Sequence, residues 1–132
     1  MSDENVEIVR RVYAEWERGS FRTTEAFDPE VHVIWVNQIF VTGSETRGID
    51  ALGRAMQEFL SAWEDATATA GEFLDGGEHV VVENVWRARG KTSGIEVEAP
   101  LWSVWTLVGG RATRVVHHDD RAQALEAAGL PE

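Results

Sequence analysis

Two long stretches of alternating side chains in the second half of the chain constrain its fold most strongly. In residues 79–89 the even positions are apolar apart from Asn84, and the odd positions include Glu83 and Arg87. In residues 95–108 the odd positions from Val97 onward are apolar apart from Ser103. A period of two is typical of strands with one face in a core. Glycine-rich turns at 75–77 and 109–110 predict consecutive hairpins, with a third strand that reaches His117.

The first half of the chain shows helical periodicity instead. Apolar residues recur from Val9 to Trp16 at helical spacing, and Gly19 follows where a helix would end. The same spacing predicts a second amphipathic helix over residues 52–63. Between them we expect a short helix around 24–27, a strand over 31–36, and a loop bracketed by Gly43 and Gly48.

A last helix is expected to begin at Asp120, which has the side chain of an N-cap and is followed by Gln123 at the capping-box position. Gly129 would end this helix. Helices set against an antiparallel sheet give an α+β fold. The chain has 132 residues and no internal repeat or linker, so we expect a single domain over residues 1–132.

The composition excludes several classes of function. The net charge of −11, from 23 acidic and 12 basic residues, argues against nucleic acid and against an anionic membrane surface as partners. There is no cysteine, so disulfides and thiol chemistry are excluded. The acidic N-terminus does not resemble a signal peptide, and no apolar run would span a bilayer, which favours a cytoplasmic protein.

Several segments resemble one known family when they are taken in order. They are Val-Tyr-Ala-Glu-Trp-Glu-Arg-Gly (12–19), Phe-Asp-Pro-Glu-Val (27–31), Val-Trp-Thr-Leu (104–107) and the ending from Asp120 to Gly129. Together they resemble the SnoaL-like polyketide-cyclase and ketosteroid-isomerase-like branch of the nuclear transport factor 2-like superfamily. The resemblance implies a cone-shaped curved sheet that encloses one pocket together with the helices. It does not imply one activity, because members of this superfamily catalyse different reactions and some catalyse none.

His117 is the first candidate for chemistry. The similar ending of related epoxide hydrolases carries a catalytic aspartate at the position of His117, and alternation would turn His117 towards the pocket. A histidine can take or give a proton near neutral pH. His118 could point either way, and Asp119 could orient an imidazole through its ring N–H. Asp120 is better explained as the helix cap. Because neighbouring strand residues face opposite sides, we expect no metal site and no cofactor.

Two well-known mechanisms of the resembled family lack their residues here. Epoxide hydrolysis would need an Arg and an Asp where this chain has Asn84 and Trp86. Steroid isomerisation would need carboxylates near Trp35 and Ser103. Asn84, on an otherwise apolar face, would then hydrogen-bond either within the core or to a ligand, and Tyr13 could supply a pocket hydroxyl or belong to the core.

The sequence therefore predicts a pocket for a small apolar ligand, polyketide-like or terpenoid-like, with one or two polar groups. An acid–base enzyme of isomerase, cyclase or dehydratase type is the leading hypothesis, and a non-catalytic ligand-binding or dimerisation module is the alternative. An exposed Trp102 next to Val104 on the convex face predicts a homodimer through that face. The expected lining residues are Tyr13, Trp35, Asn37, Trp63, Asn84, Trp86, Ser103 and Trp105.

Overall fold

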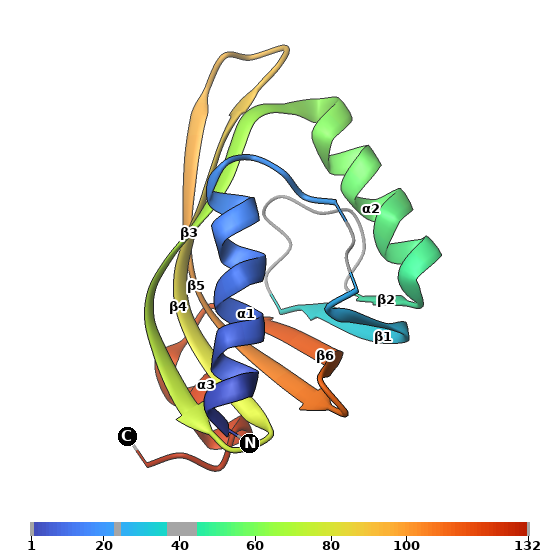
Figure 1. The fold of residues 1–132 in the computed structure, drawn as a ribbon. Helices are drawn as coiled ribbons and strands as arrows, with labels where there is room; N and C mark the ends of the chain where they lie inside the picture. Colours follow the sequence, from blue (N-terminus) through green and yellow to red (C-terminus); the bar gives the residue numbers. More distant parts are fainter. Residues whose placement is uncertain (1, 23–24, 37–44, 132) are drawn as a thin grey trace.

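Six strands form one curved sheet, and three helices pack against it in the computed structural model of the chain (Figure 1). The structure describes residues 2–22, 25–36 and 45–131. The helices are α1 (Ser2–Glu17), α2 (Ile49–Ala62) and α3 (Arg121–Ala127). The strands are β1 (Phe27–Trp35), β2 (Glu45–Arg47), β3 (Trp63–Gly76), β4 (His79–Gly90), β5 (Glu96–Val108) and β6 (Arg111–His118).

The sheet has the strand order β2-β1-β6-β5-β4-β3, so its edges are β2 and β3, and the first and last strands, β1 and β6, are neighbours inside it. The pairs β3–β4, β4–β5 and β5–β6 are antiparallel, as the hairpin turns predict. The pair of β1 with β6 is parallel, so the sheet is mixed where an antiparallel one was expected. This pair brings Trp35 beside His117, although they are far apart in sequence.

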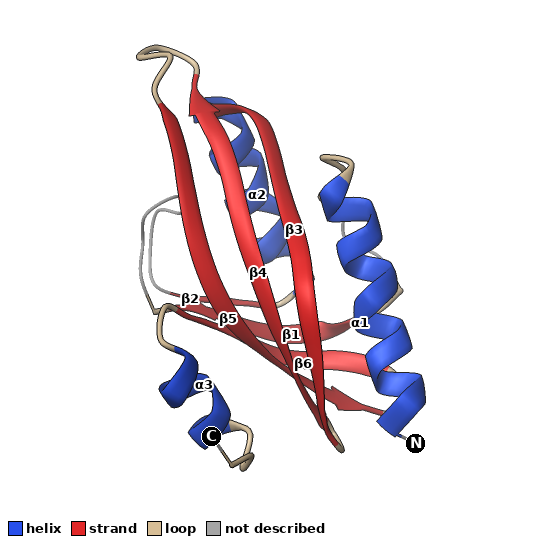
Figure 2. Cartoon of the chain, turned by 90° about the vertical axis from the view of Figure 1, so that its left-hand side faces the viewer, coloured by secondary structure: helices blue, strands red, loops and turns tan. Residues whose placement is uncertain are grey.

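Helices α1 and α2 lie on the concave side of the sheet, and α3 lies on the other side (Figures 1 and 2). The alternation of β4 and β5 decides which side chains face inward. Val80, Val82 and Trp86 on β4 are buried in the main core, together with Trp105 on β5. The α+β architecture predicted from the sequence is confirmed. Among the described helices, none is long and apolar enough to cross a membrane.

A second, smaller core lies on the convex side beneath α3. Ala124, Leu125 and Ala128 of this segment bury Val81 and Val104. The N-cap prediction is confirmed, because the side chain of Asp120 accepts a hydrogen bond from the backbone N–H of Ala122 at 3.0 Å. Helix α3 therefore fixes the direction in which the chain leaves β6, immediately after the histidine pair.

Strand β3 was not predicted from the sequence. Its residues, which include Gly71 and several acidic and alanine residues, have low strand propensity and no regular alternation. It forms because it pairs with β4 along nearly the whole length of that strand and packs against α1. The short helix expected around 24–27 is wrong in its described part, since Phe27 begins β1.

Candidate functional site

His117 lies inside the fold, near the end of β6, between β1 and β5. Its strand neighbours are Trp35 on β1 and Ser103 on β5. The imidazole is only 2% exposed and stacks on Trp35 at a ring-centroid distance of 5.8 Å. The edge of Trp86 approaches it at 5.9 Å. Burial and the neighbouring His118 lower the pKa of His117 to about 3, so the ring is neutral near pH 7.

A cavity of about 20 Å³ opens beside His117. This is room for a single water molecule, since one water needs roughly 10–15 Å³ measured in this way. His117 is the only polar side chain buried in its described lining, and Arg22 is an exposed charge at its border. The lining comprises Trp16, Phe21, Arg22, Phe27, Val33, Trp35, Leu52, Met56, Trp86, Val115 and His117.

Ser103 connects His117 to a group of polar side chains below the cavity. The Ser103 hydroxyl lies 2.6 Å from Nδ1 of His117. It also accepts a hydrogen bond from Nδ2 of Asn84 at 3.0 Å. Asn84 in turn accepts the indole N–H of Trp86 at 2.9 Å. Asn84 and Ser103 are both at most 1% exposed, so these bonds satisfy polar groups that water does not reach.

Tyr13 of α1 joins the same group from the other side. Its hydroxyl oxygen accepts the indole N–H of Trp105 at 3.2 Å and interacts with Ser103. Burial raises the pKa of Tyr13 far above its usual value. The phenol therefore keeps its proton near neutral pH and serves as a hydrogen-bonding group in this structure.

The expected pocket residues separate into three groups in the structure. Trp35, Trp86 and His117 line the cavity. Four expected residues are absent from its lining: Tyr13, Asn84, Ser103 and Trp105. Together with the indole N–H of Trp86, their polar groups form what we call the polar layer beneath the cavity. Trp63 pairs with Gly90 where β3 begins, away from the cavity. Asn37 lies outside the described residues.

His118 and Asp119 do not take the places expected for catalytic groups. His118 pairs with Trp102 on the opposite face of the sheet, and neither of its buried ring nitrogens has a hydrogen-bond partner among the described residues. Burial lowers the pKa of His118, while Asp119 and Asp120 act to raise it. Asp119 is exposed beyond the end of β6. The partner of His117 at Nδ1 is Ser103, and not Asp119 as the sequence suggested.

Aromatic and apolar residues from outside the sheet complete the cavity, and sequence reasoning did not select them. Trp16 lies in the last turn of α1, Phe21 follows this helix, and Met56 belongs to α2. Phe21 stacks on Trp86 at 5.3 Å and also contacts Trp16 at 5.8 Å. Helical spacing could identify Trp16 and Met56 as buried residues, but only the packing of the helices shows that they share one cavity.

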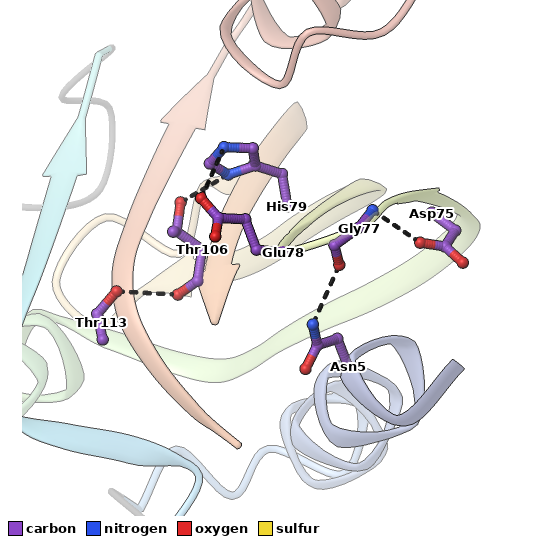
Figure 3. A network of polar contacts seen from close by, with 7 residues as sticks. All are labelled: Asn5, Asp75, Gly77, Glu78, His79, Thr106 and Thr113. Carbon is purple, nitrogen blue, oxygen red and sulfur yellow. Dashed lines mark hydrogen bonds and ion pairs between the residues drawn. The ribbon is translucent and has the colours of Figure 1, made fainter. Parts of the chain in front are cut away.

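A separate network of polar contacts lies near the β3–β4 turn (Figure 3). His79 bonds to the Thr106 hydroxyl at 2.9 Å, which joins β4 to β5, and Asn5 of α1 donates to the carbonyl of Gly77 at 3.0 Å, which joins α1 to the turn. These residues lie outside the cavity lining. Within the described part of the chain, no three His, Cys, Asp or Glu side chains are grouped as a metal site would require.

Residues 9–115 match the SnoaL-like domain family, which is most of the chain. The chain belongs to this family. A comparison with curated proteins found no match. Solved structures with the same fold are numerous.

Three solved structures show the extent of this likeness. An NTF2-like protein of unknown function from Burkholderia pseudomallei is 21% identical, with a TM-score of 0.77 over 93% of this chain and 95% of that one. A Jannaschia protein assigned as a SnoaL-like polyketide cyclase is 18% identical, with a TM-score of 0.75 over 99% and 95%. TerC, co-crystallised with polyporic acid, is 18% identical, with a TM-score of 0.75 over 96% and 98%. At these identities the likeness shows the fold alone.

Proposed function

We propose that this SnoaL-like protein binds a small, largely apolar molecule beside His117 and acts on it as an isomerase, cyclase or dehydratase. One observation carries the proposal: a buried, neutral imidazole lines a cavity whose other buried residues are apolar, and a 2.6 Å hydrogen bond with Ser103 holds it there. Such a group, preorganised and shielded from water, can stabilise charge that develops on a substrate oxygen. TerC, which has the same fold and was co-crystallised with polyporic acid, supports a small organic ligand on this fold.

Binding requires the cavity to enlarge. Its volume of about 20 Å³ is far below the ~300–1,000 Å³ of sites for drug-sized ligands. Met56 is the most adaptable member of the lining, because its side chain is unbranched and has three rotatable bonds. We therefore expect ligand entry to displace Met56 and the neighbouring Phe21, which both lie on the helical side of the cavity.

A non-catalytic binding protein is the second candidate, and a specific observation favours it. The described lining contains no carboxylate that could remove a proton from a carbon atom. With a pKa of about 3, His117 is itself a weak base near neutral pH. A protein of this kind would hold its ligand through the same contact at His117 without transforming it.

A binding screen against metabolite extracts, followed by turnover assays on each ligand found, separates these candidates. Wild type should bind and convert a ligand, and His117→Ala should lose at least about tenfold in turnover, which corresponds to one charge-stabilising hydrogen bond. His79→Ala, a histidine change outside the cavity, is the matched control and should leave turnover unchanged. Unchanged turnover in His117→Ala contradicts the catalytic role, and binding without turnover supports the second candidate.

A further inference from the structure

Two groups in the polar layer beneath the cavity, the indole N–H groups of Trp86 and Trp105, can take part in hydrogen bonds in one direction only. An indole N–H can only donate, so Trp86 and Trp105 must each face an acceptor. Trp86 donates to Asn84, which places the amide oxygen towards Trp86 and the amide nitrogen towards Ser103. The amide nitrogen also faces two backbone carbonyls, of Val82 at 3.0 Å and of Leu101 at 3.4 Å, which agrees with this orientation.

Asn84 is therefore a donor to Ser103, and the Ser103 proton must go elsewhere. Tyr13 already accepts the Trp105 N–H. Among the hydrogen bonds of Ser103 in the described part of the chain, the acceptor left for its proton is Nδ1 of His117, 2.6 Å from the hydroxyl oxygen. In the reverse arrangement Nδ1 of His117 would donate to Ser103, and the buried Ser103 proton would lose this acceptor, which is costly.

We infer that Ser103, oriented by Asn84, holds His117 in the tautomer that carries its proton on Nε2, and that this N–H binds a carbonyl or other oxyanion-forming oxygen of the ligand. Nδ1 is used by Ser103, and Nε2 is bonded to no residue in the described parts of the chain, which leaves it for the cavity. Ser103 and Asn84 are positioning residues in this assignment, because they act through His117 and do not touch the ligand.

The assignment narrows the ligand class. A fixed N–H donor in an apolar cavity favours ketones, quinones, enolates and phenolates over hydrocarbons of the same shape, because only these offer an acceptor.

The assignment also limits the reactions in which His117 can take part. His117 would polarise a carbonyl group and stabilise an enolate without giving up its proton, because a proton moved along this chain would leave a buried anion at Ser103 or Tyr13. The inference rests on the proposed function only for the placement of the ligand beside His117.

The tautomer can be measured on the free protein. In ¹⁵N NMR of histidine-labelled wild type, with the His117→Phe variant used for assignment, we expect an unprotonated Nδ1 and a protonated Nε2 for His117 near pH 7. Ser103→Ala should give a mixture of both tautomers. Ser93→Ala, a serine change in the β4–β5 turn, is the matched control and should leave the His117 signals unchanged. A protonated Nδ1 in wild type, or an unchanged tautomer in Ser103→Ala, overturns the assignment.

The ligand class is tested with a shape-matched pair, cyclohexanone and methylenecyclohexane, which differ in one oxygen atom. We expect the ketone to shift the Nε2–H signal and to bind roughly five- to tenfold more tightly than the alkene, as one buried hydrogen bond implies. Trp86→Phe releases the orientation of Asn84 and should reduce this ratio. Equal binding of the two compounds, or no effect of the ketone on Nε2–H, contradicts the ligand class.

The outcomes separate the two proposals. The expected tautomer without turnover of any extract compound refutes catalysis and leaves the hydrogen-bond assignment intact. A reversed tautomer refutes the assignment and leaves His117 available as a proton acceptor in an enzyme.

Discussion

At the scale of single residues, His117 gains its properties from burial. Its side chain faces the core because of strand alternation, and its surroundings are tryptophans and one serine rather than carboxylates. A neutral, oriented imidazole results. This differs from the proton-transfer group that the sequence suggested, since both the low pKa and the contact of Nδ1 with Ser103 argue for hydrogen bonding.

The low pKa of His117 predicts acid sensitivity. The ring has a pKa of about 3 in the folded protein against an ordinary value of 6.5, so the unfolded chain binds more protons between these values. The free energy of unfolding should therefore be highest above about pH 6.5 and fall as the pH decreases, by ~2 kcal/mol at pH 5 from this group. Urea unfolding at pH 7.5 and pH 5 measures the difference, and His117→Phe should lose that part of it.

His118 also makes the free energy of unfolding fall as the pH decreases, because its pKa is lowered in the folded protein as well. His118→Gln therefore serves as the comparison for His117→Phe. Equal pH sensitivity in wild type and His117→Phe contradicts the burial argument for His117.

Asn84 is expected to be the most sensitive residue of the polar layer. Asn84→Ala leaves the Trp86 N–H and one side of Ser103 without partners in a region that excludes water. We expect a loss of about 2–3 kcal/mol in unfolding free energy. Chemical denaturation measures it, with Asn5→Ala as the control, since half-buried Asn5 donates to the Gly77 carbonyl at the β3–β4 turn (Figure 3). A similar small loss in both variants contradicts the prediction.

At the scale of elements, the junctions of α1 and α3 with the sheet set the position of the site. Gly19 ends α1 with a φ of 82°, as its C-cap position predicts, and the chain then turns back so that Phe21 reaches the cavity. Asp120 follows the end of β6 and caps the N-terminus of α3. Both junctions were recognisable in the sequence because they depend on local backbone conformation.

Gly19→Ala and Gly53→Ala form a matched pair with opposite expected signs. A side chain at Gly19 would adopt a left-handed conformation and place Cβ 3.2 Å from the carbonyl of Ala66, so we expect a loss of ~1–2 kcal/mol. Gly53 lies within α2 with nothing within 4 Å of the added carbon, so alanine there should stabilise by ~0.5–1 kcal/mol. Thermal unfolding compares the two, and equal signs would refute this account.

At the scale of the whole molecule, the convex face differs from the surface that the sequence suggested. Val104 is 4% exposed because α3 covers it, and Trp102 is half-buried with the Arg121 guanidinium 5.3 Å from its ring. The prediction that Trp102 and Val104 form an uncovered surface on the convex face is therefore wrong. Assembly through this face stays a prediction, now with α3 as part of the contact surface (Figure 2).

We expect a homodimer in sedimentation equilibrium, weakened by Trp102→Ala, because a half-buried tryptophan beside an arginine is typical of contact sites. Ile95→Ala, which removes an exposed apolar side chain just before β5, is the control and should leave the mass unchanged. A monomeric wild type at the concentrations used for ligand binding contradicts the prediction.

The sequence by itself determined the α+β class, helices α1 and α2, strands β4 and β5, and the inward position of His117, because each depends on periodicity or on one local turn. It could not determine β3, whose low strand propensity is overridden by pairing with β4, or the parallel β1–β6 pair that stacks Trp35 on His117. Nor could it determine the size of the cavity.

Only the tertiary structure decided what surrounds His117. Tyr13, Asn84, Ser103 and the two tryptophan N–H groups come from α1, β4 and β5, and their spacing in sequence carries no information about which atoms meet. Hydrogen-bond direction depends on such contacts over a few ångströms. The sequence therefore identified the residue that faces the cavity, and the packing of distant elements decided which of its nitrogens is free to bind a ligand.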